Sequence, residues 1–312
     1  MTDIPGNRNS REAAMSVYTR IRDARSRVNL RLFTFYLAIV LIIPAITTLI
    51  EYLVTVNPGL RADLRIDMQN FHLYQVFTSS FVHLNFDHFL ANVTAYLLIA
   101  VYGLVLATLV NRKRLYLVAS KIIVVIFVLF GAAFAIFNAT TTYYAGLSGI
   151  DSALAGLLLL FWLLYLEHTA KQRMRHYYGL ILFFILALSA GIVARYILLY
   201  HAGRNALLLS LLVSFIVLGA LCVFYYRDQF FDLYRVLGEF SWSSRIITMA
   251  IIAIFAFFIW NLFPERLANL SVTAGVPLHL AGIVIGILAG YFLFAYLEGF
   301  AYFSDEKEVI SR

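Results

Sequence analysis

Four polar residues within apolar segments of this chain could together perform acyl transfer. Ser148 opens an apolar run after the polar stretch 138–143. His88 and Asn92 lie four residues apart in another apolar run, and His279 lies near the start of the last one. A bilayer contains no water to satisfy polar groups, so polar side chains inside it usually face a cavity and carry function. This set supplies a nucleophile, a base and oxyanion donors, which favours an enzyme over a scaffold.

The composition of the chain is that of a membrane protein. Hydrophobic residues make up 62% of the 312 residues and charged residues 13%, whereas soluble domains carry about 25% charged residues. The net charge of +7 does not indicate a nucleic-acid partner, because the basic residues flank apolar runs and form no stripe with interleaved aromatic residues. Cys222 is the only cysteine, so the chain cannot form an internal disulfide.

About eight apolar runs have the length of a membrane-spanning helix. They cover residues 32–55, 87–110, 115–137, 148–166, 177–200, 206–226, 246–263 and 278–302. The sequence therefore predicts an all-α polytopic membrane protein. We expect a basic N-terminal segment over 1–31, a transmembrane domain over 32–302 and a short tail over 303–312.

Lys and Arg residues outside the predicted spans are distributed unequally between the two sides of the membrane. The N-terminal segment and every second loop after it hold most of them, including Arg112, Arg173, Arg235 and Lys307. Cytoplasmic loops carry an excess of basic residues, so both termini are expected in the cytoplasm and the number of spans is even. The expected location is the plasma membrane, with lipid as a partner.

Two connecting stretches are predicted to lie along the membrane surface, with ordinary loops as the alternative. Asn57 and Pro58 have the form of an N-cap followed by proline at the first helical position. The apolar residues that then share one helical face are Leu60, Leu64, Met68 and Phe71. On the other side of the membrane, residues 228–244 mix aromatic with charged side chains.

Small residues follow both Ser148 and His279. Gly282, Gly286 and Gly290 form a stripe along one face of the predicted last helix, with His279 at its head. Because small residues let membrane helices approach closely, we expect the helices of Ser148 and His279 to pack together. Both residues lie near the starts of spans that run in the same direction, so their depths in the membrane agree.

His88 and Asn92 share one helical face because they are four residues apart. Both can donate hydrogen bonds to a developing oxyanion, and the backbone N–H of Ser148, near a helix N-terminus, is a third donor. His83 is expected to brace a loop. The chain contains no HExxH sequence, so it does not fit the zinc proteases that carry that motif.

The chain resembles the rhomboid family of intramembrane serine proteases in three motifs that occur in order on separate spans. Gly-Leu-Ser-Gly at 146–149 is similar to the GxSG motif of that family, and His-Phe-Leu-Ala-Asn at 88–92 is similar to its HxxxN motif. His279, with the glycines that follow it, resembles the last core helix. The resemblance extends over about residues 32–302.

The resemblance implies a Ser148–His279 dyad in a water-filled cavity that opens outward. It further implies that His88, Asn92 and the Ser148 amide form the oxyanion hole, and that the reaction needs neither cofactor nor metal. Transmembrane proteins would be the substrates, through hydrolysis of their peptide bonds. Asp151 is either a third catalytic residue or a carboxylate favoured by the helix dipole, and the dyad of the family favours the second interpretation.

The sequence departs from the family in two respects. The family has a six-helix core with one helix between the serine and the last histidine, whereas three predicted spans separate Ser148 from His279 here. About two helices are therefore added to the core. The Trp-Arg pair common in the first loop of the family is also absent from residues 56–86. An inactive rhomboid-like protein that binds membrane clients, or a transporter or channel, remains an alternative.

Overall fold

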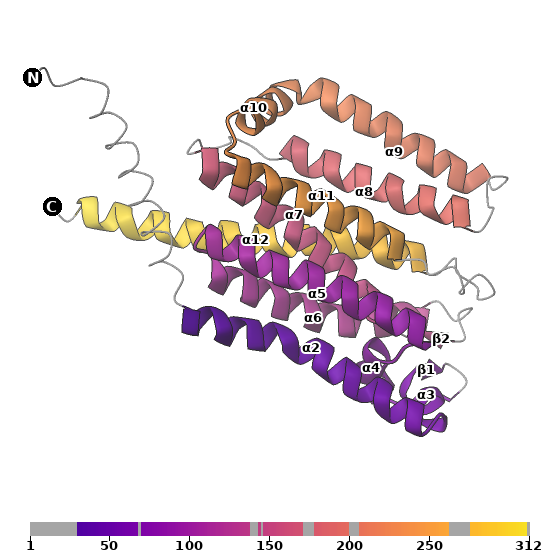
Figure 1. Ribbon diagram of the computed structural model, residues 1–312. Helices are drawn as coiled ribbons and strands as arrows, with labels where there is room; N and C mark the ends of the chain where they lie inside the picture. The colour runs from indigo at the N-terminus through magenta and orange to yellow at the C-terminus, as the bar shows by residue number, and fades with distance from the viewer. Residues whose placement is uncertain are drawn as a thin grey trace, which may run out of the picture.

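The computed structural model describes residues 30–67, 70–137, 143–144, 146–170, 178–199, 206–261 and 275–310. Long helices occupy every predicted apolar run (Figure 1). These helices are α2 (Leu30–Val56), α5 (Phe86–Leu109), α6 (Lys113–Phe137), α7 (Ser148–Ala170), α8 (Tyr178–Leu199), α9 (Ala206–Tyr225), α11 (Trp242–Asn261) and α12 (Gly275–Ile310). Within the described residues, six of them are long and apolar enough to cross a membrane: α2, α5, α7, α9, α11 and α12. The chain is therefore an all-α, multi-pass membrane protein.

Shorter elements connect these helices. They are α3 (Gly59–Leu64), β1 (Ile66–Asp67), α4 (Gln75–Thr78), the 3₁₀ helix η1 (Ser79–Phe81), β2 (Tyr143–Tyr144) and α10 (Arg227–Gly238). β1 pairs with β2 in antiparallel register, with Ile66 opposite Tyr144. This pairing connects the loop after α2 to the segment that leads into α7.

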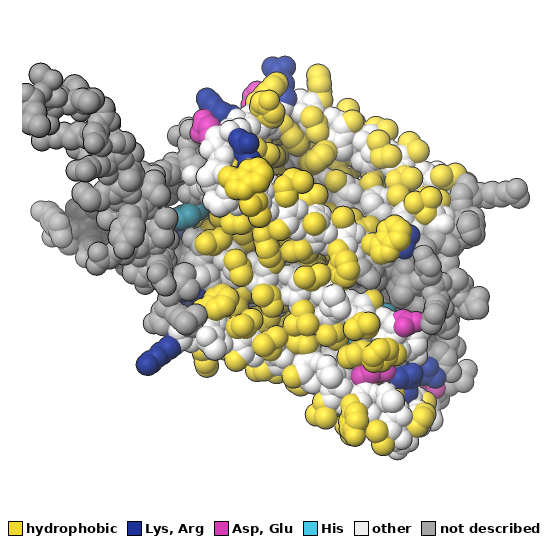
Figure 2. Space-filling view, viewed as in Figure 1, with side chains coloured by type: hydrophobic (Ala, Val, Ile, Leu, Met, Phe, Trp, Pro, Cys, Tyr) yellow, Lys and Arg dark blue, Asp and Glu magenta, His cyan; other side chains and the backbone are white. Residues whose placement is uncertain are grey.

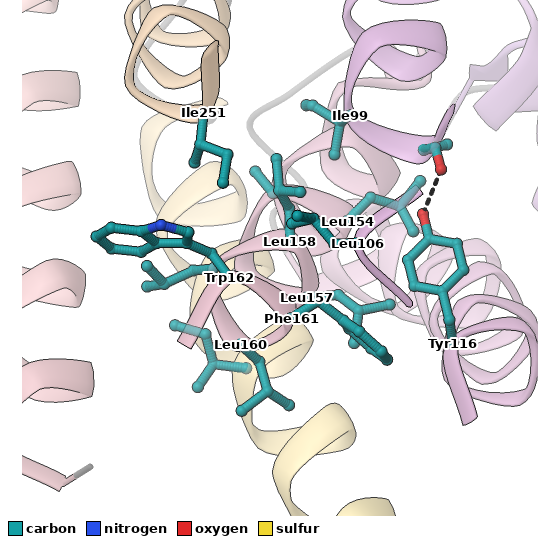
Figure 3. Close-up of a cluster of buried hydrophobic side chains, with 14 of the residues drawn as sticks. Ile99, Leu106, Tyr116, Leu154, Leu157, Leu158, Leu160, Phe161, Trp162 and Ile251 are labelled. Carbon is teal, nitrogen blue, oxygen red and sulfur yellow. Dashed lines mark hydrogen bonds between the residues drawn. The ribbon is translucent and has the colours of Figure 1, made fainter. Parts of the chain in front are cut away.

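Helix α7 is the central element of the bundle. Its residues are buried without interruption over 149–166, as expected for a helix that is apolar on all sides. Figure 3 shows its apolar side chains between Ile99 of α5 and Ile251 of α11. On another side, Phe161 contacts the ring of Tyr116 from α6, whose hydroxyl donates to the Ala100 carbonyl at 2.8 Å. These contacts fix the positions of α5, α6 and α11 relative to α7, which carries Ser148 at its first turn.

Helices α7 and α12 lie side by side and run in the same direction. Gly282 lies against Gly149, and Gly286, one turn later, lies against Ala153. In Figure 1 both helices begin at the end of the bundle that carries α3, β1 and α4, opposite the start of α2. Ser148 and His279 therefore enter the bundle from the same end, as the three spans predicted between them require.

The loop after α2 differs from the predicted amphipathic segment. Helix α3 begins one residue later than expected, with Pro58 in place of Asn57 at the cap position. It ends at Leu64, because the chain becomes extended at Arg65 (φ −87°, ψ 154°) and then pairs with β2. The predicted face is wrong beyond Leu64, and Met68 lies outside the described residues.

An ion pair ties α3 to α2. Arg61 donates from Nη2 to the buried Glu51 carboxylate at 2.7 Å, and from Nη1 to the Leu84 carbonyl at 3.2 Å. Because the Glu51 side chain is buried, removing Arg61 would leave an uncompensated buried charge, which is destabilising. The pair fixes the approach of the chain to α5.

The predicted surface segment over 228–244 is helical over α10. Its Leu233 and Val236 are buried while Phe231 and Tyr234 are exposed, which gives the helix two distinct faces. Helix α12 continues to Ile310, so the segment predicted as a tail, 303–312, is helical over most of its length.

The outer surface fits a lipid environment. Figure 2 shows hydrophobic side chains spread over the middle of the visible face, with charged side chains mainly near its two ends. In α9, all of which is described, only Gly219 and Cys222 are buried. A helix so apolar and so exposed is expected to face lipid.

The direction of the helices predicts which connections share one side of the membrane. With both termini in the cytoplasm, as the charge distribution predicts, single cysteines at Asn57 and Gly203 in a Cys222→Ser background should react with a membrane-impermeant thiol reagent on intact cells. Cysteines at Arg173 and Glu239 should react only after permeabilisation. Labelling of positions 57 and 239 from the same side would contradict the arrangement of the helices.

Candidate active site

A glycine with an unusual backbone conformation precedes Ser148. Gly146 has φ of +118°, a conformation that residues with a side chain rarely adopt. Its N–H donates to the Ser79 carbonyl at 2.9 Å, which ties the segment to η1. A Cβ at Gly146 would lie 2.9 Å from Cε1 of His88 and 3.4 Å from Nδ2 of Asn92. The absence of a side chain thus lets the Gly-Leu-Ser-Gly segment lie directly against His88 and Asn92.

Ser148 is the first residue of α7 and is half-buried, while its neighbours Leu147 and Gly149 are buried. The first N–H groups of a helix have no partner within the helix. The Ser148 amide is one of them, and the positive end of the helix dipole lies at the same place. A negative oxygen near Ser148 would therefore meet both a donor and a favourable potential.

The first turn of α5 positions His88 and Asn92. Asn85 is the N-cap, and its side chain accepts the His88 N–H at 2.8 Å. Nε2 of His88 lies 3.1 Å from Nδ2 of Asn92, and both side chains are buried. Because the amide nitrogen only donates, Asn92 gives one hydrogen to His88 and keeps a second one for another acceptor. His88 then carries its own proton on Nδ1.

His279 lies in the first turns of α12 and is buried against the start of α7. Its Nδ1 lies 3.2 Å from Oγ of Ser152, and that hydroxyl donates to the Ser148 carbonyl at 2.8 Å. The imidazole also lies close enough to His88 for the two rings to interact electrostatically. The structure thus brings together all four residues singled out in the sequence: Ser148, His279, His88 and Asn92.

His83 packs against the site without entering it. The residue is fully buried, and its ring meets the ring of His88 edge-on with centroids 5.1 Å apart. Phe89 contacts it on another side, at 5.7 Å between centroids. Burial lowers the pKa of His83 well below its usual value, and the nearby His88 and Arg61 lower that pKa further, so its ring is neutral. This geometry fits the bracing role expected from the sequence.

Asp151 and Ser152 differ in their contacts with His279. Asp151 is buried, and among the described residues neither of its carboxylate oxygens has a hydrogen-bond partner. The carboxylate therefore does not orient His279. Ser152, one residue later and not singled out in the sequence, contacts the imidazole instead. The available signal was its spacing, because residues 148 and 152 share one helical face.

The crossing of α7 and α12 brings backbone against backbone. A Cβ at Gly286 would overlap the Ala153 carbonyl, and a Cβ at Gly156 would overlap the Ile283 carbonyl. At Gly282 a Cβ would lie 2.6 Å from that of Ser152. The glycine stripe predicted from the sequence faces α7, and it sets the distance between His279 and the first turn of that helix.

Comparison of the chain with protein-family models, with curated proteins and with solved structures finds no match. Within the described residues, no group of three or more His, Cys, Asp or Glu side chains is arranged to hold a metal ion.

The close crossing of α7 and α12 predicts that a single added methyl group destabilises the protein. Gly286→Ala should lower the thermal unfolding temperature of the detergent-solubilised protein, because the added carbon has no space beside the Ala153 carbonyl. The destabilisation expected for such overpacking is about 1–3 kcal/mol. Gly219→Ala in α9 is the matched control, since a Cβ there meets no atom within 4 Å. Equal unfolding temperatures for the two variants would contradict the crossing.

Proposed function

We propose that this protein is a rhomboid-type intramembrane serine protease that hydrolyses peptide bonds of transmembrane proteins. The observation that carries the proposal is the convergence of three motifs from different helices at the first turn of α7. His279 reaches that turn through Ser152, and Gly146 lies against His88 and Asn92. A nucleophile, a base and oxyanion donors at one buried corner are the minimum set for acyl transfer.

Each residue has a defined part in the proposed reaction. Ser148 Oγ attacks the carbonyl carbon of the scissile bond while His279 takes the hydroxyl proton. The charge that develops on the carbonyl oxygen is stabilised by the Ser148 N–H and by Asn92 and His88. His279 then gives its proton to the leaving amine, and an acyl-enzyme on Ser148 remains. Water repeats the attack with His279 as base, which releases the acyl product and restores the serine.

The proposed core consists of α2, α5, α6, α7, α11 and α12, with α8 and α9 as the two added helices. Helix α11 contacts both α5 and α7: Tyr102 donates to the Ile247 carbonyl at 3.0 Å, and Tyr165 donates to Ser244 Oγ at 3.1 Å. Helices α8 and α9 pack mainly on each other and lie beyond α11 in Figure 1. This arrangement supports α11 as the counterpart of the single helix that separates serine from histidine in the family, and therefore as the gating helix.

We propose that the protein lies in the plasma membrane with both termini in the cytoplasm and that about eight helices span the bilayer. The end of the bundle that holds Ser148 then faces outward, so water reaches the site from outside. A transmembrane substrate must unwind to expose its carbonyl, and small or helix-breaking residues near its outer boundary lower the cost of unwinding.

Two alternatives from the sequence receive less support. An inactive relative that binds membrane clients needs neither the serine nor the histidine, whereas here Ser148 and His279 share a hydrogen-bonded contact through Ser152. A transporter is expected to have paired broken helices near the middle of the membrane. The polar residues of this site lie instead at the ends of α5, α7 and α12.

The proposal is tested with purified protein in liposomes and a single-span reporter substrate. The wild type should cut the reporter near its outer membrane boundary without added metal or nucleotide. Ser148→Ala and His279→Ala should each abolish cleavage with an unchanged unfolding temperature, because each removes a reacting group. Ser189→Ala, which removes a buried hydroxyl from α8, should remain active. Cleavage that persists in Ser148→Ala would refute the assignment.

The proposed oxyanion donors predict a smaller loss. Asn92→Ala and His88→Ala should each lower kcat by about 10²–10³ and leave KM nearly unchanged, because these hydrogen bonds strengthen only as charge develops. Thr108→Ala at the opposite end of α5 is the control. If both variants turn over at the wild-type rate, the donors lie elsewhere in the site.

A further inference from the structure

The Ser152 hydroxyl lies between the nucleophile and the base. Ser152 is fully buried, one helical turn after Ser148, on the face of α7 that meets α12. Its Oγ is 2.8 Å from the Ser148 carbonyl oxygen and 3.2 Å from His279 Nδ1. These two contacts of the hydroxyl therefore connect the proposed nucleophile, Ser148, to the proposed base, His279.

The hydrogen count of these contacts fixes the protonation of the imidazole. A carbonyl oxygen only accepts, so the single hydroxyl hydrogen of Ser152 points to the Ser148 carbonyl. Oγ then faces His279 with a lone pair, and Nδ1 must carry the hydrogen that joins them. In a neutral imidazole only one nitrogen carries a proton, so Nε2 presents its lone pair.

We propose that Ser152 is a positioning residue that fixes the tautomer and the ring orientation of His279. This inference rests on the proposed function, because a base on Nε2 has a purpose only if Ser148 is the nucleophile. In Ser-His-Asp enzymes a buried carboxylate holds the imidazole by Nδ1–H, and the wrong tautomer is severely damaging. Here a neutral hydroxyl takes that position, while the Asp151 carboxylate one residue earlier has no contact with the ring.

A neutral acceptor accounts for the size of the expected effect. One ordinary hydrogen bond contributes a factor of about 5 to an equilibrium, less than a bond to a carboxylate. Ser152→Ala should therefore lower kcat by about 2- to 5-fold, because a fraction of the imidazole adopts the other tautomer or loses its orientation. KM should stay unchanged, since the hydroxyl is directed at the enzyme's own backbone and base.

Ser120→Ala is the matched control for the kinetic measurement. Ser120 in α6 also donates to the carbonyl four residues before it, that of Tyr116, at 2.8 Å. Both substitutions remove a back-bonded hydroxyl from an apolar helix, and only one of them touches a catalytic residue. Ser120→Ala should keep the wild-type kcat, and an equal loss in both variants would reduce Ser152 to a structural role.

The tautomer itself is measured by ¹⁵N NMR of the protein labelled in histidine. The chain has seven histidines, so the His279 signals are identified by their loss in His279→Gln. The wild type should show a protonated Nδ1 and an unprotonated Nε2, and Ser152→Ala should add a signal of protonated Nε2. A wild-type His279 protonated on Nε2, or one unaltered by Ser152→Ala, would overturn the inference even if cleavage is normal. A wild type that cuts no reporter would instead overturn the proposed function, while the tautomer measurement would still decide the role of Ser152 toward His279.

Discussion

The contact between the backbones of α7 and α12 is the constraint on which the rest of the site depends. Lipid tails are as apolar as leucine, so membrane helices gain little by hiding apolar side chains from lipid and associate through close packing. Gly286 and Gly156 remove the side chains that would hold the two helices apart. With the backbones in contact, His279 at the head of α12 meets the first turn of α7. A wider crossing would leave the same residues at the same depth and out of reach of each other.

Polar groups near the first turn of α7 form hydrogen bonds with residues three or four positions away in the sequence. Asn85 binds the His88 amide, Asn92 binds the His88 ring, and Ser152 binds the carbonyl four residues before it. Such local bonds satisfy polar groups without water and hold each ring in one orientation. The donors that remain are the Ser148 amide, the second amide hydrogen of Asn92 and the Nδ1–H of His88. In an oxyanion site the donors are directed before charge develops, so reorganisation during the reaction is small.

The helices and the residues of the candidate site could be predicted from sequence patterns, whereas the contacts between distant segments could not. Long apolar runs and the glycine spacing after His279 depend on local chemistry. The helices begin and end within a few residues of the expected positions, except that α12 continues to Ile310. The extension at Arg65 was missed because it depends on pairing between β1 and β2, which are far apart in the chain. Ser152 was missed for the same reason. A serine at this spacing is compatible with packing or with a hydrogen bond, and only the position of α12 distinguishes the two.

In the proposed six-helix core, α8 and α9 are an insertion between two residues that must stay together. Helices α8 and α9 form an antiparallel pair, so the chain returns to the end of the bundle from which α11 departs. An odd number of added crossings would deliver α12 from the opposite end and separate His279 from Ser148 by the thickness of the membrane. The pair is anchored by Arg195 of α8, whose guanidinium lies 3.7 Å from the centre of the Trp260 ring in α11. The proposed insertion therefore enlarges the apolar outer surface and leaves the crossing of α7 and α12 intact.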